Sequence, residues 1–282
     1  MMQLRRMFSL YKLASISTGN LVILLLGFYY GGASAQSSED FWVLAYPEPP
    51  FVEQTDKGKL TGFLVDEVNG ILTTAGIHQQ ILLAPWKRLE QEAKIKANVL
   101  AFALTRTAES EQNYHWITPL TANVYSVYSS QKLASPLNNL EQLSEFDSIA
   151  VLENDVRHKI LQAQNAKNIH AYTSWSEAID SVVNEHSSAI FFSDAGMQYF
   201  CRVQGKGCSQ LERVFMYEET VTYLTLSKLE SSPELVNRLK NAAKQYKQSD
   251  AFKRISKYWL KQYENLPIPM HMEEGVLNLW NK

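Results

Sequence analysis

The sequence predicts an α/β protein assembled from two similar units. Short apolar runs typical of strands alternate with amphipathic runs typical of helices along most of the 282 residues, which favours a mainly parallel sheet covered by helices. A chain of this length can form one large domain or two medium ones. Its 45% hydrophobic and 20% charged residues are typical of globular proteins, and its net charge of -2 does not indicate a nucleic-acid partner.

The first 35 residues have the organisation of a secretory signal peptide. A basic segment is followed by an apolar run of ten residues from Leu21 to Tyr30, and then by small residues that include Ala33 and Ala35. This order predicts cleavage after Ala35 and a periplasmic location for the rest of the chain. The alternative is a membrane anchor, but the apolar run is only about half of the ~20 residues that span a bilayer.

The first unit is expected to contain three strands separated by two helices. The strands are apolar runs at 41–46, 80–84 and 99–104. The helices, over 62–76 and 86–96, carry apolar residues at helical spacing, and Gly76 is placed to end the first of them. The segment between the first strand and the first helix is expected to be a loop or a hairpin.

The second unit repeats this alternation with more elements. Its strands are expected at 123–130, 148–152, 169–172, 189–193 and 220–227. Its helices are expected at 135–143, at 155–164, at 174–185 and from Asp194 onward. Two amphipathic helices close the pattern, the first over 233–248 and the second with Phe252, Ile255 and Trp259 on one face.

Capping residues support three of the helices in the second unit. Asp155 is placed to cap the helix over 155–164, and Asp194 is placed to cap the helix that follows it. Ser174 and Glu177 have the spacing of a capping box.

The two cysteines, Cys201 and Cys208, are expected to form a disulfide. They lie close together in "CRVQGKGC", where two glycines let the chain turn, and an exported protein meets an oxidising compartment. Free thiols are the alternative. No metal-ligand cluster and no cofactor motif is visible, and the chain is expected to be a monomer without a metal or a cofactor.

Several runs together resemble the bacterial periplasmic solute-binding proteins of family 3, the polar-amino-acid transporter type. In order, they are "YPEPPF", "GKLTGFLVDEVNGI", "APWKRL", "ALTRTAESEQNYHWITPL", "NNLEQLSEFDSIAVL", "AIFFSDAG" and the stretch from "YLTLSKLESSPELV" to "ISKYWL". The resemblance covers about residues 40–262 and rests on the order and spacing of the runs, because no single run is specific.

The resemblance implies a two-lobe periplasmic binding protein of the Venus-flytrap type (type II), with a mixed sheet in each lobe and a two-strand hinge. Lobe one would comprise 36–126 plus 222–265, lobe two 127–221, and the tail 266–282, to which no role is assigned. The hinge strands would lie near Tyr125–Ser129 and Thr220–Leu224, and ligand binding would close the lobes.

The resemblance also implies ligand contacts in the first lobe. Trp86 stands where the family holds an aromatic residue that stacks on the ligand, although a tryptophan at a helix start also packs into cores. Glu48 stands where the family often has an aromatic residue, and its carboxylate would attract a cationic group or face solvent. Phe51 would line the cleft or the core.

The carboxylate clamp of the family is altered in this sequence. Its arginine is expected at the position of Ser110, so Arg106, four residues earlier, would have to replace it through its planar guanidinium. Thr105 stands where the family uses a hydroxyl or backbone group. Asp194 aligns with the acid that pairs with the α-amino group of the ligand.

The second anion-binding element of the family is altered as well. Asn154 and Asp155 replace the Gly-Thr or Gly-Ser pair whose amides bind the ligand carboxylate at a helix N-terminus. An aspartate there would repel an anion, and Arg157 is placed to compensate. Both changes argue against an ordinary α-amino acid as the ligand.

The leading functional hypothesis is therefore capture of a small polar solute, amino-acid-like or amine-bearing, for an ABC transporter or a membrane sensor. One alternative is a periplasmic dehydratase-type enzyme on the same fold, for which Glu48, Asp194 and His115 are the acid/base candidates. The other is a binding module that serves only a sensor protein.

Overall fold

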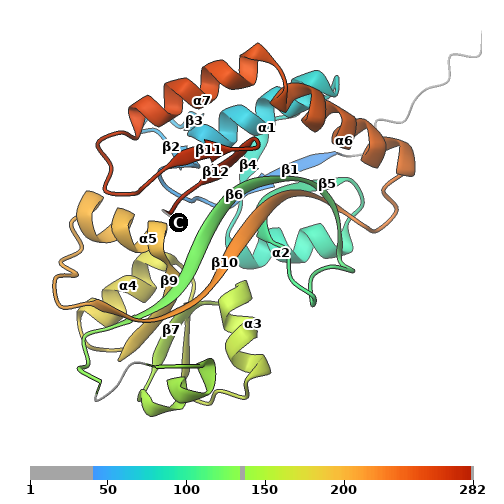
Figure 1. Cartoon of the computed structure of the whole chain (residues 1–282). Helices are drawn as coiled ribbons and strands as arrows, with labels where there is room; N and C mark the ends of the chain where they lie inside the picture. Colours follow the sequence, from blue (N-terminus) through green and yellow to red (C-terminus); the bar gives the residue numbers. More distant parts are fainter. Residues whose placement is uncertain (1–40, 134–136, 281–282) are drawn as a thin grey trace, which may run out of the picture. The chain divides into compact units, whose positions relative to one another are not determined.

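The fold is organised around two long antiparallel strands, β6 (Tyr114–Ser129) and β10 (Glu212–Ser227), in a computed structural model of the chain. The structure describes residues 41–133 and 137–280, so the expected signal peptide, 1–35, lies outside the described residues. β6 and β10 pair along their whole length, and Figure 1 shows them running side by side between two groups of helices.

The main sheet has the strand order β4-β1-β5-β10-β6-β9-β7-β8, with β12 also paired to β6 and β11 paired to β12. The remaining strands are β1 (Trp42–Ala45), β2 (Glu53–Gln54), β3 (Leu60–Thr61), β4 (Ile81–Leu83), β5 (Val99–Thr105), β7 (Ile149–Leu152), β8 (Ile169–Tyr172), β9 (Ala189–Ser193), β11 (His271–Glu273) and β12 (Val276–Asn278). β2 and β3 form a separate antiparallel hairpin. The sequence had left a loop or a hairpin open for this segment after the first strand.

Each half of the main sheet is mixed. β1 pairs in parallel with β4 and β5, and β7 pairs in parallel with β8 and β9. The antiparallel partners are β10, which joins β5 over Thr222–Leu226, and β6, which joins β9 over Tyr125–Ser129. The two long strands thus link two βα units, which confirms the predicted fold class. The lobe boundaries stay a prediction.

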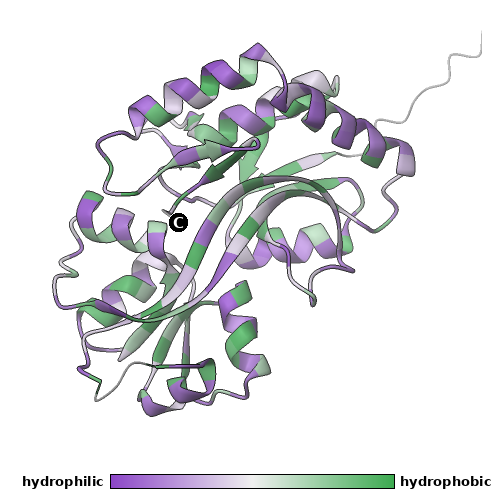
Figure 2. Cartoon of the chain, in the orientation of Figure 1, coloured by the Kyte–Doolittle hydropathy of each residue, from purple (hydrophilic) through white to green (hydrophobic). Residues whose placement is uncertain are grey.

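The helices flank the two halves of the sheet. They are α1 (Phe63–Thr74), α2 (Trp86–Ile95), α3 (Val156–Ala163), α4 (Trp175–Val183), α5 (Asp194–Gln198), α6 (Pro233–Lys247), α7 (Asp250–Gln262), the 3₁₀-helix η1 (Leu140–Glu145) and the π-helix η2 (Tyr199–Val203). In Figure 2 the strands β1, β7 and β9 are mostly hydrophobic, whereas the helices mix hydrophobic and hydrophilic residues. No helix in the described part of the chain has both the length and the apolar character to cross a membrane.

Local sequence signals predicted three of the helix ends. Asp155 caps α3, and Ser174 forms the expected capping box with Glu177. Gly76 follows α1 with φ of +66°, a left-handed conformation that glycine adopts without strain. One cap is different from the prediction, because Ser193 caps α5 and Asp194 is the first helical residue.

Three predictions about element bounds were wrong. β6 begins at Tyr114 and β10 at Glu212, whereas the sequence predicted strands only from 123 and 220. The predicted α-helix over 135–143 is a 3₁₀-helix, η1, over Leu140–Glu145, and residues 134–136 are not described. In the parts that were missed, each long strand pairs mainly with the other, since β10 meets β5 only over Thr222–Leu226 and β6 meets β9 only over Tyr125–Ser129. Polar residues interrupt the apolar pattern there.

The disulfide between Cys201 and Cys208 is formed, as predicted. It closes the turn that follows η2. Phe200 of η2 and Gln204, the residue after η2, line the cavity described below.

The C-terminal tail forms a hairpin that docks on β6. β11 and β12 are antiparallel, and β12 adds to β6 in parallel, with Leu277 opposite Thr121. Lys247 holds the hairpin turn, since its Nζ donates to the carbonyl oxygens of Gly275 (2.5 Å) and Pro119 (2.6 Å). The same Nζ lies 2.9 Å from Oε1 of the fully buried Glu67. Burial raises the pKa of Glu67 to about 7, and Lys247 acts in the opposite direction.

We expect Lys247→Met to lower the free energy of unfolding by about 3 kcal/mol, because Glu67 and two carbonyl groups would lose their cation. Urea unfolding measures the change. The double variant Glu67→Gln/Lys247→Met removes both charges, and we expect it to be less destabilised than the sum of the two single variants. Additive effects would show that the two side chains do not stabilise each other.

Candidate ligand-binding site

A cavity of about 300 Å³ lies where the carboxyl ends of the parallel strands face the two long strands. Tyr46 follows β1, Thr105 ends β5, Leu152 ends β7, Ser174 follows β8 and Ser193 ends β9, and all of them line the cavity. In open α/β sheets the loops at these strand ends are where ligands bind, because they converge there and carry the side chains that vary. The site therefore draws residues from both halves of the sheet.

Seven of the 24 residues that line the cavity are aromatic. They are Tyr46, Phe51, Trp86, Tyr125, Trp175, Phe192 and Phe200. Two of these, Trp86 and Trp175, occupy the same place in the two units, since each is the first residue of the helix that follows a strand of the parallel set. Such walls bind the apolar body or the cationic group of a small ligand.

The guanidinium of Arg157 is the cation of the cavity. Only 6% of Arg157 is exposed, and its Cζ lies 4.3 Å from the ring centre of Tyr125 and 4.4 Å from that of Trp175. Burial by itself would lower the pKa of Arg157, but the neighbouring Asp155 and Tyr125 outweigh it and hold that pKa above its ordinary value. The guanidinium is therefore charged and held between two aromatic rings.

Asp155 holds this guanidinium with both carboxylate oxygens. Nε of Arg157 donates to Oδ1 at 2.5 Å and Nη2 donates to Oδ2 at 2.7 Å, a bidentate pair. Oδ1 also accepts from the backbone N–H of Arg157 at 2.9 Å, which is the N-cap of α3. Asp155 is 3% exposed, so one buried carboxylate both starts the helix and neutralises the arginine.

Glu48 is the second acid that lines the cavity, and unlike Asp155 it is not bonded to Arg157. Its side chain is half-buried in the loop after β1, and among the described residues it forms no ion pair or hydrogen bond. Burial raises the pKa of its carboxyl to about 7; Arg157 pulls that pKa down and Asp155 pushes it up. The carboxylate of Glu48 is thus available to a ligand and changes its charge near neutral pH.

Backbone strain occurs at the edge of the cavity. Ala103 has φ of +67° inside β5, a conformation rare for residues other than glycine. The pairing of β5 with β10 shifts at this point, with Phe102 opposite Leu224 and Leu104 opposite Tyr223, so Ala103 is a β-bulge. The bulge turns the end of β5 and lets Thr105 reach the hydroxyl of Tyr125 at 2.7 Å.

The structure brings five of the seven sequence-predicted ligand residues to this cavity. These are Glu48, Phe51, Trp86, Thr105 and Asp155. Trp86 was expected either to contact the ligand or to pack in the core, and it does line the cavity and pack against the core. Its ring meets that of Tyr46 edge to face, with the ring centres 6.0 Å apart. Its Nε1 is buried and has no acceptor among the described residues.

Arg106 does not line the cavity. Its guanidinium pairs with Glu111 through two bonds of 2.7 Å, and it lies over the rings of Trp116 and Tyr223. Ser110, at the expected position of the family arginine, closes the turn by accepting from the backbone N–H of Thr107. The structure therefore gives neither position a place in the aromatic cavity.

Asp194 also lies outside the cavity. Its carboxylate accepts from the hydroxyl of Tyr128 at 2.7 Å and pairs with Arg213 at 2.8 Å. It faces a different hollow, which is lined by residues of the C-terminal tail. The neighbours of Asp194, Ser193 and Ala195, line the cavity instead.

Sequence reasoning missed the central position of Arg157 and the aromatic residues of the second unit. Arg157 was expected only to compensate for Asp155. A signal for Trp175 was present, because it follows a capping serine at a helix start as Trp86 follows Pro85. Tyr125 and Phe192 gave no such signal, since alternation along a strand does not tell which face meets a cavity.

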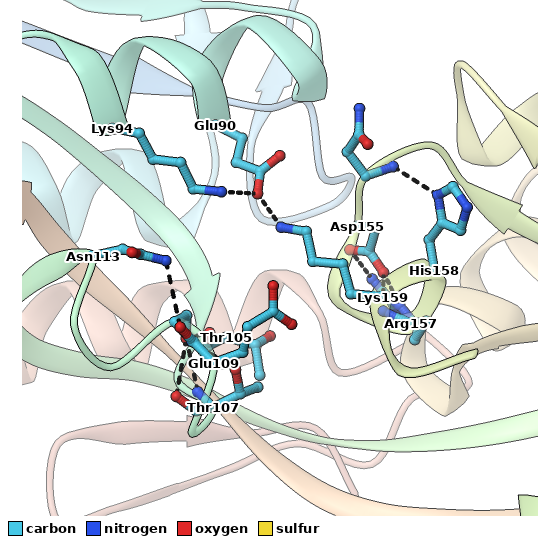
Figure 3. A network of polar contacts seen from close by, with 12 residues as sticks. Glu90, Lys94, Thr105, Thr107, Glu109, Asn113, Asp155, Arg157, His158 and Lys159 are labelled. Atoms are coloured by element: carbon cyan, nitrogen blue, oxygen red, sulfur yellow. Dashed lines mark hydrogen bonds and ion pairs between the residues drawn. The ribbon is translucent and has the colours of Figure 1, made fainter. Parts of the chain in front are cut away.

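Ion pairs join the two halves of the site. Lys87 of α2 pairs with Glu153 at 2.9 Å, and Glu90 of α2 is bonded by Lys159 of α3 and by Lys94. Figure 3 shows Lys159 extending toward the carboxylate of Glu90, beside the pair of Asp155 and Arg157. These contacts lie outside the aromatic cavity, because none of the lysines and glutamates that form them lines it.

The comparison with protein families gives one match. The model of the bacterial extracellular solute-binding proteins, family 3, matches residues 43–262. The chain belongs to this family. No curated protein is found to match it.

Solved structures of solute-binding proteins share the two-lobe fold. The arginine-, lysine-, histidine-binding protein ArtJ from Geobacillus stearothermophilus is 19% identical, with 81% of this chain and 97% of that chain covered and a TM-score of 0.63. A histidine kinase sensor domain with similarity to periplasmic binding proteins is 14% identical, with 79% and 96% covered and a TM-score of 0.66. An ancestral amino acid-binding protein, a precursor of cyclohexadienyl dehydratase, is 17% identical, with 78% and 94% covered and a TM-score of 0.62.

The cavity of this family member contains aromatic, hydroxyl and amide groups, the carboxylate of Glu48 and one bidentate ion pair. Among the described residues, no three His, Cys, Asp or Glu side chains are close enough together to hold a metal ion.

We expect Arg106→Ala to leave ligand affinity unchanged, because Arg106 is exposed and bonded to Glu111 outside the cavity. A small decrease in Tm is expected from the lost contacts with Trp116 and Tyr223. Isothermal titration with any ligand of the wild-type protein measures the affinity. A loss of tenfold or more would mean that Arg106 reaches the ligand after all.

Proposed function

We propose that this chain captures a small amine-bearing solute in the aromatic cavity, outside the cytoplasmic membrane, and delivers it to an ABC transporter or a membrane sensor. The observation that carries the proposal is the carboxylate of Glu48, which lines the cavity and forms no bond with the protein in the described residues. A protonated amine would supply the missing partner through a charge-assisted hydrogen bond.

The charge balance of the cavity supports an amine. The described residues that line it include three charged side chains, Glu48, Asp155 and Arg157. Asp155 and Arg157 neutralise each other, so the ionised Glu48 leaves one net negative charge. The rings of Trp86 and Tyr46 would contact the apolar part of the ligand. The faces of these rings would also attract its cationic group, most strongly in a site with little water.

The family and its relatives support the cellular role. The extracellular solute-binding family implies a protein that works outside the cytoplasm, and the expected signal peptide agrees with that location. A relative of the same fold binds arginine, lysine and histidine, all of which carry amino groups, and another is the sensor domain of a histidine kinase. A transporter and a sensor therefore remain equal candidates for the partner.

The proposed mechanism is closure of two lobes about the long strands. With lobe one at 36–126 plus 222–265 and lobe two at 127–221, the ion pairs from α2 to the α3 region would form on closure. Ligand contacts to both lobes would then shift the population toward the closed state, because only that state makes all of them.

An enzyme on the same fold is a less well supported alternative. A pKa of about 7 suits Glu48 to general acid/base catalysis. However, the two other candidates named from the sequence, His115 and Asp194, do not line the cavity, so the pair that such a reaction needs is not assembled there.

We expect phenethylamine or butylamine to raise the Tm of the mature protein at pH 8, and to bind about tenfold more weakly at pH 6. The sign follows from Glu48: below its pKa of about 7 the carboxyl holds a proton, which the ammonium group must displace. The amines themselves stay protonated over this range. Titration calorimetry at several pH values measures the slope.

Glu48→Gln should abolish both the affinity and its pH dependence, whereas Glu141→Gln, an exposed acid in η1, should change neither. Binding of butyrate or phenylacetate by the wild-type protein, without any response to the amines, would contradict the proposal.

A further inference from the structure

The cation of the cavity already has a carboxylate bound to it. Arg157 is directed into the site from the start of α3 and would be suited to a ligand carboxylate, since its fork matches two carboxylate oxygens. That fork is occupied by both oxygens of Asp155, at 2.5 and 2.7 Å.

We propose that Asp155 is a built-in substitute for a ligand carboxylate, and that it restricts the cavity to amines that lack a carboxylate. The ligand class would be a carboxylate-free amine with an apolar or aromatic body, and Asp155 would be the residue that determines this specificity. The ligand class rests on the proposed function, but the role of Asp155 on Arg157 does not.

The one remaining approach to the guanidinium is unfavourable for an anion. Its contacts with Tyr125 and Trp175, at 4.3 and 4.4 Å, bring an aromatic ring against the group. Nε and Nη2 are bonded to Asp155, which leaves the Nη1 end. A carboxylate that approached this end would meet the negative field of Asp155 and, above its pKa, of Glu48, because both acids line the same cavity.

Asp155 is fixed where it is by a second function. The oxygen that binds Nε also caps α3 by accepting from the backbone N–H of Arg157. Turning the carboxylate away to admit a ligand would therefore break the cap and the ion pair together, inside a region that is 3% to 6% exposed. The exclusion is a permanent property of the site and does not depend on a switch.

The altered motifs in the sequence agree with this geometry. Ser110 replaces the arginine that the resemblance predicts in the first unit, and it closes a turn. Asn154 and Asp155 replace the small residues whose amides would bind an anion in the second unit. Asp155 thus removes one anion site as a helix cap and a second as the partner of Arg157.

The first test is Asp155→Asn. Asparagine caps helices as well as aspartate does, but it cannot neutralise the guanidinium. We expect acetate, propionate and butyrate to raise the Tm of this variant by about 5 °C at a hundredfold excess over Kd, and to leave the wild-type Tm unchanged at equal ionic strength. Chloride serves as the control anion.

A matched double variant separates the cation from the rest of the cavity. Asp155→Asn/Arg157→Gln keeps the cap and removes both charges, so we expect it to show no response to carboxylates. A carboxylate response of equal size in the double variant would overturn the role of Arg157. Equal Tm values of Asp155→Asn in acetate and in chloride would overturn the proposal itself.

If Asp155→Asn is unfolded as purified, refolding from urea in acetate and in chloride replaces the Tm measurement. Recovery in acetate alone supports the proposal. Recovery in neither salt counts against it, since a guanidinium freed for carboxylates would be neutralised by acetate.

The wild-type protein allows a second test with a matched pair of ligands. Phenethylamine and phenylalanine differ by one carboxylate, and we expect at least a hundredfold preference for the amine. Equal affinity would overturn the proposed specificity. If neither ligand binds while Asp155→Asn responds to acetate, the proposed function fails and the role of Asp155 stands.

Discussion

The guanidinium of Arg157 is buried at the meeting point of the two units, and a buried charge must have a counter-charge within hydrogen-bonding distance. Asp155, two residues earlier, meets this requirement from the cap of α3. The rings of Tyr125 and Trp175 lie against the neutralised cation and add cation–π contacts to the ion pair. This one pair both starts α3 and forms part of the cavity wall.

The two long strands give the site its two sides. β6 and β10 each take part in both halves of the sheet, so a change in their twist would move the strand ends that carry the cavity residues. The C-terminal hairpin adds to β6 beside this region and is held by Lys247, which also contacts the buried Glu67. The tail is therefore part of the framework around the long strands, and its position could not be read from a segment with two prolines and little periodicity.

Sequence patterns predicted the βα units, the capping residues and the disulfide because each rests on local chemistry. Aspartate and serine cap helices when they precede an amphipathic run, as Asp155 and Ser174 do. Two cysteines seven residues apart in an exported chain are close enough to form a disulfide. The site depends on contacts between distant segments, which local patterns do not encode. Arg106 and Asp194 were both expected in the site. Each is instead held outside the cavity by an ion pair, Arg106 with Glu111 and Asp194 with Arg213.

The most direct measurement is a crystal structure of the mature protein with the ligand that copurifies from its own cells, identified by mass spectrometry. We expect a carboxylate-free amine whose nitrogen lies within hydrogen-bonding distance of Glu48, while Arg157 remains bonded to Asp155. A ligand carboxylate bound to Arg157, with Asp155 displaced, would contradict the account.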